Sequence, residues 1–398
     1  MSYLEESRTA GRHVLPDLVR AFAVFGIVLV NVAYLAYPGV VTYHDGGLNS
    51  TLDYSAYFGV NALATLKSYT LFSLMFGVGL AYQMQSAERR NQPFGRRYTR
   101  RLLGLLILGI LHVSFAFVGD ILIVYAVLGA LLYLFRNKPV KSLLRWGISL
   151  IILQILIVLI FAGALYMGET YAPEEIAKAA AATQAGLPEY YSVYGEGTLP
   201  EIMAFRWKDW LGYLAFAGTM QIPGVFAFFC LGLAMVKSGI ISDPSAPIWS
   251  KARRLAFPIG IAISLIAACI TISTKDSISS TGIFGLALTV IGSPFVTFGY
   301  MGWLAKWAAG PDSAVKTFLA RGGTATLTAY LMQSIILSLI FCGYGFGLYG
   351  KIGAAGCIAI AAITGIFTIC FASLWRAKYA RGPFEYALRR FTYLGAEQ

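Results

Sequence analysis

The chain has 398 residues and a formal net charge of +12 at pH 7, with 58% hydrophobic and only 13% charged residues. Soluble domains carry about 25% charged residues, so this composition and a mean hydropathy of +0.67 exclude a soluble protein. We predict an all-α integral membrane protein that forms a single polytopic domain over residues 1–398. The five cysteines lack the spacing of metal ligands, and no metal site is predicted.

About ten apolar runs approach the ~20 residues that a transmembrane helix needs. In chain order, the predicted spans cover residues 18–37, 65–84, 102–118, 120–135, 146–166, 212–236, 255–273, 283–303, 325–344 and 354–375. A polar loop that contains Asp53 separates the first two spans. Residues 168–208 are rich in glutamate and predict an extracytoplasmic loop with a short helix after Pro173. Residues 376–398 predict a cytoplasmic tail.

The basic residues are distributed unevenly between the two sides of this topology. All but seven of the 31 lysines and arginines fall on the side that carries both termini. The positive-inside rule therefore predicts a multi-pass protein of the cell inner (plasma) membrane with both termini cytoplasmic. Short basic clusters between spans suit anionic lipid, so the lipid bilayer is the expected partner and nucleic acid is not. The sequence does not decide whether the protein forms a homodimer.

Two successive spans, joined by a turn at Gly119 and Asp120, contain the first candidate site. His112 is the titratable residue that interrupts the apolar run of the first of them. A histidine inside a span is a functional-site hypothesis by default. The alternatives are an interhelical hydrogen bond for His112 and a helix N-cap for Asp120. Lys67, near the start of the second span, either snorkels to the outer interface or pairs with Asp120.

Two polar residues occupy equivalent positions in different spans. Asn31 follows Arg20 by eleven residues, and His112 follows Arg101 by the same number. Eleven residues of helix span ~16 Å, which is close to three turns. If these helices are neighbours, the Asn31 amide lies at the depth of the His112 imidazole and orients a substrate carbonyl beside it.

A further pattern extends over nearly the whole chain. It consists of DLVRAFA (residues 17–23) with Gly26 and Asn31, LFSLMFGVG (71–79), His112 with GDIL (119–122) and YA (125–126), TAYLMQS (328–334) and GPFEY (382–386). Together these stretches resemble the YeiB-like family of bacterial membrane proteins, known as domain of unknown function 418. Two positions depart from the family pattern: Ala21 replaces its usual glycine and Tyr386 its usual tryptophan.

That family is distantly similar to transmembrane acyltransferases, which move acyl groups from a coenzyme A thioester onto sugars or other acceptors. Their first span opens with Asp-Gly-Leu-Arg, followed after ten residues by an essential histidine. In this chain Asp17, Leu18, Val19 and Arg20 match the opening, and Asn31 occupies the histidine position. The resemblance implies acyl-CoA as the donor substrate, and it does not firmly imply any cofactor.

Two functions from different classes remain open. The first is a membrane acyltransferase-like protein that takes an acyl group from a cytoplasmic acyl-CoA-type donor. The alternative is a transporter or lipid-handling protein without catalysis, in which the same residues line a pathway. For the first, the candidate catalytic residues are His112 as general base, Asn31 and Asp120, and the candidate binding residues are Asp17, Arg20, Arg97, Arg101 and Lys67. Asp17 and Arg20 serve equally as an ion pair that anchors the first span. The sequence leaves open whether the protein is an enzyme and which acceptor or ligand it binds.

Overall fold

The computed structural model describes residues 13–89, 91, 93–274 and 278–394. Most of these residues are helical, and none of them forms a β-strand. The helices are α2 Val14–Ala36, α3 Thr51–Leu63, α4 Lys67–Arg89, α5 Phe94–Phe115, α6 Leu122–Leu134, α7 Val140–Tyr171, α8 Pro173–Glu196, α9 Leu199–Lys237, α10 Pro247–Lys251, α11 Phe257–Ser273, α12 Ser280–Ala309, α13 Ala314–Gly322, α14 Thr326–Phe341, α15 Ala354–Lys378 and α16 Pro383–Thr392. The predicted all-α fold is confirmed.

The helices form a multi-pass membrane bundle. Within the described residues, eight helical segments are long and apolar enough to cross a membrane, and α13 with α14, bent by 76°, makes a ninth. Helix α6 has 13 residues and is therefore ~20 Å long, which is short of the ~30 Å hydrocarbon core. The span predicted at 120–135 is thus a partial one, whose N-terminus lies inside the bundle and not at its surface.

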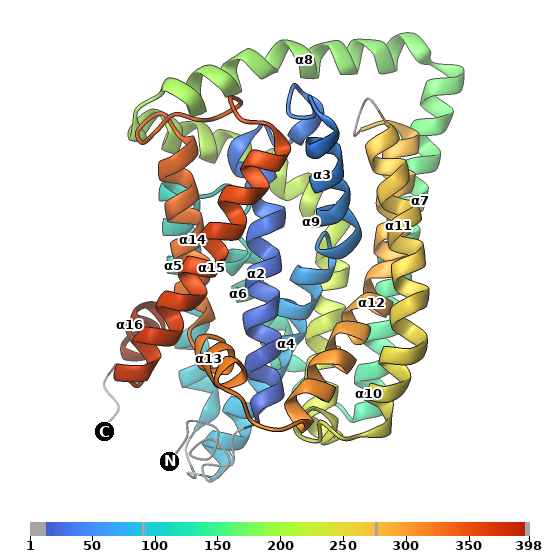
Figure 1. The fold of residues 1–398 in the computed structure, drawn as a ribbon. Helices are drawn as coiled ribbons and strands as arrows, with labels where there is room; N and C mark the ends of the chain where they lie inside the picture. The colour runs from blue at the N-terminus through green and yellow to red at the C-terminus, as the bar shows by residue number, and fades with distance from the viewer. Residues whose placement is uncertain (1–12, 90, 92, 275–277, 395–398) are drawn as a thin grey trace.

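Two predicted loops are helical. Helix α3 occupies most of the loop expected before the second span and continues, after a break at residues 64–66, into α4 (Figure 1). The loop expected at 168–208 consists of the end of α7, the 24-residue α8 and the start of α9. The alanine-rich sequence of α8 favours helix strongly. Figure 1 shows α8 lying across the bundle instead of along it.

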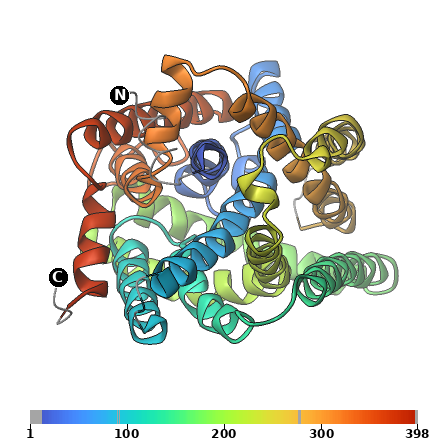
Figure 2. The ribbon, with the colours of Figure 1, turned by 90° about the horizontal axis from the view of Figure 1, so that it is seen from below.

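The bundle has two distinct ends. We name the end where α2 begins and α16 lies the basic end, and the opposite end the α8 end (Figure 1). Seen from the basic end, α2 lies near the centre and α7 at the edge (Figure 2). Helix α2 packs against α4, α12, α13, α14 and α15. Its contact with α4 is close, because a Cβ at Gly26 would lie 2.1 Å from the Ser68 Oγ. The residues 1–12, Lys275 and 395–398, which include part of the predicted tail, lie outside the described residues.

Candidate functional site

A cavity of about 1060 Å³ opens at the basic end, which we name the arginine cavity. Its volume matches the upper range of ligand sites. Helices α2, α4, α5, α6 and α16 and the break between α13 and α14 contribute to its wall. The charged residues on the wall are Asp17, Arg20, Arg89, Arg97, Arg101, Arg381, Glu385 and Arg389. The excess of arginine suits an anion such as a phosphate, which guanidinium groups bind in bidentate fashion.

Four predicted binding residues meet in the arginine cavity: Asp17, Arg20, Arg97 and Arg101. The Arg20 Nη1 lies 3.1 Å from the Asp17 Oδ1, which confirms the predicted ion pair. The Arg97 guanidinium lies over the Tyr393 ring, 5.0 Å from its centroid. Among the described residues, the Arg101 guanidinium has neither a hydrogen bond nor an ion-pair partner. The Arg101 guanidinium therefore keeps its donor groups for a ligand.

Glu385 fixes α16 at the mouth of the arginine cavity. Its Oε1 accepts hydrogen bonds from the backbone N–H groups of Leu327 (2.8 Å) and Thr328 (3.1 Å), and its Oε2 accepts one from the Thr328 hydroxyl. The sequence favours an ion pair between Glu385 and Arg389 at i, i+4. This expectation is wrong, because both oxygens serve the N-terminus of α14 and the Arg389 guanidinium lies over Tyr393.

A second group of predicted residues forms a buried pair. The His112 Nδ1 lies 2.7 Å from the Asp120 Oδ2, and the two side chains are 1% and 0% exposed. The Asp120 Oδ1 accepts a hydrogen bond of 2.8 Å from the Ile123 N–H, so the carboxylate also caps the start of α6. Gly109 makes room for it, since a Cβ there would lie 2.7 Å from the Asp120 Oδ1. Asp120 therefore accepts a hydrogen bond at the start of α6 and also binds His112, so the capping role and the hydrogen-bonding role that the sequence offered occur together.

The hydrogen bond to Asp120 fixes the tautomer of His112. An ionised carboxylate only accepts hydrogen bonds, so the Asp120 Oδ2 accepts from the Nδ1–H of His112, and in the neutral imidazole this leaves the lone pair on Nε2. The His112 Nε2 is buried and has no hydrogen-bond partner among the described residues. A buried polar atom without a partner is uncommon and requires an explanation. A carboxylate-oriented imidazole with an unoccupied Nε2 is the geometry of a general base.

An aromatic layer separates the His112–Asp120 pair from the arginine cavity. The Tyr330 ring lies 5.0 Å from the His112 ring, centroid to centroid, and 6.3 Å from the Phe72 ring. The Tyr330 hydroxyl accepts a hydrogen bond of 3.4 Å from the Ile121 N–H. Phe72 and Leu122 line the cavity, whereas His112 and Asn31 do not. The arginines and the imidazole therefore occupy adjoining compartments of the bundle.

Asn31 and Lys67 lie apart from both compartments. Asn31 is partly exposed on α2, which packs mainly against α4 and α15, whereas α5 packs mainly against α6 and α16. Within the described residues, no hydrogen bond joins Asn31 to His112. Among the described residues, α2 does not pack closely against α5, so the neighbouring arrangement that would place the Asn31 amide beside the His112 imidazole is not present.

Lys67 is fully buried and does not snorkel to an interface. Its Nζ donates to the Asn61 carbonyl over 2.9 Å. The predicted ion pair with Asp120 is wrong, since both Asp120 oxygens serve His112 and Ile123. The helix α3 explains the error: it extends the span toward the α8 end and so places Lys67 within the bundle.

Sequence patterns did not identify Arg206, which the loop assignment placed outside the bundle. It is 1% exposed. Its guanidinium donates to the Ser114 carbonyl (3.2 Å), the Ser338 hydroxyl (2.8 Å) and the Tyr344 hydroxyl (3.3 Å). The adjacent Trp207 donates its indole N–H to the Ser114 Oγ over 3.1 Å. Because Ser114 is two residues from His112, α9 covers the end of α5 on the α8 side of the buried pair.

The fold and these two compartments define a class of protein: an all-helical, multi-pass membrane protein with a basic cavity and a buried histidine–aspartate pair. The model of the family "Protein of unknown function (DUF418)" matches residues 235–395. The "Uncharacterized protein YxaH" of Bacillus subtilis (strain 168) is 31% identical over 99% of this chain and 97% of its own length. The chain belongs to the YeiB-like DUF418 family.

Two further relatives agree with this assignment. The "Uncharacterized protein YeiB" of Escherichia coli (strain K12) is 26% identical over 96% of each chain. The "Uncharacterized 39.9 kDa protein in amylase 3'region" of Bacillus acidopullulyticus is 32% identical over 38% of this chain and 40% of its own. No solved structure matches the chain. The first two relatives are therefore similar to this chain over nearly its whole length, and their names state no activity.

Proposed function

We propose that this protein is a membrane-bound acyltransferase-like protein that moves an acyl group from an acyl-CoA-type donor to an acceptor hydroxyl or amine. The observation that carries the proposal is the buried His112, with Nδ1 held by Asp120 and Nε2 without a partner. In this proposal the basic end is cytoplasmic and both termini face the cytoplasm, as the positive-inside rule predicts. The arginine cavity then receives the phosphates of the donor.

The proposed reaction uses His112 as general base. Its Nε2 accepts the acceptor's proton while the acceptor oxygen or nitrogen forms a bond to the thioester carbonyl carbon. The bond from carbon to sulfur then breaks, and the leaving thiolate takes the proton from the imidazolium. Asp120 keeps the proton on Nδ1 and stabilises the imidazolium. Donor binding requires the rings of Tyr330 and Phe72 to move, since they lie between the arginine cavity and Nε2.

Asn31 and Lys67 receive no role in this reaction. Neither lines the arginine cavity or hydrogen-bonds to the His112–Asp120 pair. The catalytic assignment therefore rests on His112 and Asp120, and the donor-binding assignment on Asp17, Arg20, Arg97 and Arg101. Asp17 orients the Arg20 guanidinium and does not itself contact phosphate in this proposal.

The test is a binding and turnover assay on the purified protein in lipid nanodiscs. Radiolabelled acetyl-CoA and long-chain acyl-CoA serve as donors, with sugars and amines as acceptors. We expect His112→Ala and Asp120→Asn to abolish transfer and to leave donor binding intact. Arg101→Gln should weaken donor binding. His44→Ala is the matched control, because His44 lies in the loop after α2 and belongs to neither α5 nor the start of α6. Full transfer by His112→Ala, or its loss only in His44→Ala, overturns the assignment.

A transporter or lipid-handling function is the second candidate, and the interrupted spans favour it. The chain breaks between α3 and α4, where Leu66 has a φ of +63°, and bends by 76° between α13 and α14. Interrupted helices often form the substrate sites of transporters. Uptake or release of a labelled substrate by proteoliposomes, lost in Arg101→Gln and retained in His112→Ala, supports this alternative over acyl transfer.

A further inference from the structure

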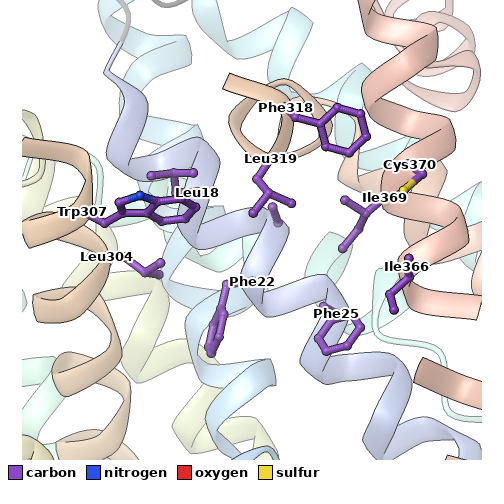
Figure 3. Close-up of a pocket in the computed structure, with 11 residues that line it drawn as sticks. Leu18, Phe22, Phe25, Leu304, Trp307, Phe318, Leu319, Ile366, Ile369 and Cys370 are labelled. Atoms are coloured by element: carbon purple, nitrogen blue, oxygen red, sulfur yellow. The ribbon is translucent and has the colours of Figure 1, made fainter. Parts of the chain in front are cut away.

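A second cavity lies on the other side of α2 from the arginine cavity. It has a volume of about 280 Å³, and its wall comes from α2, α12, α13 and α15 (Figure 3). Leu18, Phe25, Trp307, Leu319 and Ile369 are representative of its lining, in which the heteroatoms of side chains are the Trp307 indole nitrogen and the Cys370 sulfur. This cavity has no charged residue on its wall, so its chemistry suits a hydrocarbon.

The cavity opens toward the outer surface of the bundle. Phe22 and Ile366, which belong to its wall, are 40% and 56% exposed. In a multi-pass membrane protein, such apolar side chains on the outside of a span face lipid. The inner wall is buried, with Leu18 and Ile369 at 2% and 8% exposure. The cavity is therefore a recess that is continuous with the lipid-facing surface.

The depth of the recess matches the acyl chains of one leaflet. Leu18 and Phe25 are the fifth and twelfth residues of α2, so they lie ~6 Å and ~17 Å from its start at 1.5 Å per residue. One leaflet contributes about half of the ~30 Å hydrocarbon core. The recess thus extends from just inside the interface at the basic end to about the middle of the bilayer.

The part of the recess wall that α13 contributes is held in place by hydrogen bonds. Helix α13 contributes Phe318 and Leu319 to it. The fully buried Lys316 of α13 donates to the carbonyl of Gly310 over 2.7 Å and to that of Ala308 over 3.4 Å. These bonds join α13 to the C-terminal end of α12, the helix that carries Trp307. The recess is therefore preformed and does not depend on a mobile segment.

The helix ends around the recess are basic. Lys306 lies in the last turn of α12, and Arg376 and Lys378 lie in the last turn of α15. Cations near the membrane surface attract anionic headgroups. The recess is too small to hold a protein helix, which is ~10–12 Å wide with its side chains. The volume of the recess also lies below the ~300–1000 Å³ that is usual for small-molecule sites.

We propose that this recess binds one acyl chain of an anionic phospholipid from the leaflet at the basic end, with the headgroup beside the basic ends of α12 and α15. The lipid packs against α2 on the face opposite Asp17 and Arg20. This binding site does not depend on acyl transfer, because it shares no lining residue with the arginine cavity.

The probe for the test is phosphatidylglycerol with a diazirine in the middle of one acyl chain. The protein is reconstituted in nanodiscs of phosphatidylethanolamine and this probe, irradiated and digested, and the adducts are located by mass spectrometry. We expect more adducts on the peptides containing Leu18 to Phe25 and Ile366 to Cys370 than on the lipid-exposed helix α7. Even labelling of all lipid-facing helices means annular lipid only and overturns the proposal.

Filling the recess provides the matched comparison. Ala21 is 4% exposed on its wall, so Ala21→Phe should reduce labelling of the recess peptides to the level of α7. Ala164→Phe, on the exposed face of α7, should leave the labelling unchanged. Cys370→Phe is the second filling variant should Ala21→Phe not elute as a monodisperse helical protein. Undiminished recess labelling in a folded filling variant overturns the site, and equal labelling by a phosphatidylcholine probe overturns its preference for anionic lipid.

Discussion

Gly109 tests the close packing that holds the His112–Asp120 pair together. A Cβ at Gly109 would lie 2.7 Å from both the Asp120 Oδ1 and the Ile123 Cγ1, and 2.9 Å from the Ile123 backbone nitrogen. Gly109→Ala therefore forces the start of α6 away from α5, and overpacking of this kind costs about 1–3 kcal/mol. Alanine also favours helix over glycine by about 1 kcal/mol, so the two effects must be separated.

Gly163→Ala separates them, because Gly163 lies in α7 and a Cβ there would meet no atom within 4 Å. Both variants gain helix propensity, whereas only Gly109→Ala overpacks. We expect the free energy of unfolding of Gly109→Ala to be lower than that of Gly163→Ala by about 1–3 kcal/mol, measured by SDS titration in bicelles with circular dichroism. Equal free energies for the two variants would show that α5 and α6 have room at Gly109 and would refute the geometry of the pair.

Three further predictions concern other parts of the molecule. Glu385→Gln should loosen α16, because each hydrogen bond to a carboxylate contributes about 1.5–3 kcal/mol, and trypsin should then cleave after Arg389 faster than in wild type. Arg206→Gln should destabilise the protein by about 1–3 kcal/mol in thermal unfolding, since it leaves buried partners unsatisfied, whereas Lys208→Gln, in a pair with 66% and 52% exposed side chains, should have a far smaller effect. Cysteines introduced at Gly186 and Lys141 in a cysteine-free background should react differently with an impermeant maleimide in intact cells. Labelling of Lys141→Cys alone would contradict a cytoplasmic basic end.

Local sequence predicted the features that depend on local contacts. The all-α fold follows from the apolar runs. The sequence selected His112 and Asp120 as candidate residues but did not predict their pairing, which a separation of eight positions and one turn makes possible. The arginine cavity followed from the alternation of spans, which returns Arg20 and Arg101 to the same end. Helix α3 was missed because Asp53 and Asn61 lower its hydropathy.

Distant contacts could not be read from the sequence. The Asp53 Oδ1 accepts a hydrogen bond from the Ala355 N–H, 302 residues away, so a residue that looks solvated is instead a buried cap. Arg206 reaches Ser338 across 132 residues, and Glu385 reaches Leu327 across 58. Each of these partners depends on how helices pack, and a single sequence contains no record of that packing.

Four charged residues in this bundle share a structural explanation. An interrupted helix leaves N–H groups or carbonyls without partners, and these must be satisfied inside the protein. Asp120 and Glu385 accept from N–H groups at the starts of α6 and α14, and Lys67 and Lys316 donate to carbonyls near the ends of α3 and α12. Each charge has the sign that the helix dipole favours at that end, with carboxylates at helix N-termini and ammonium groups at helix C-termini.

Stabilisation of helix ends therefore accounts for these four residues without any ligand. It does not account for the His112 Nε2, which is buried and serves no helix end. Leaving a buried polar group unsatisfied costs about 1–3 kcal/mol, and a residue that only packed helices would avoid that cost by turning Nε2 toward a hydrogen-bond donor. The unfilled position at Nε2 is consequently where a substrate proton or a bound water is expected, and it is the atom on which the acyl-transfer proposal depends.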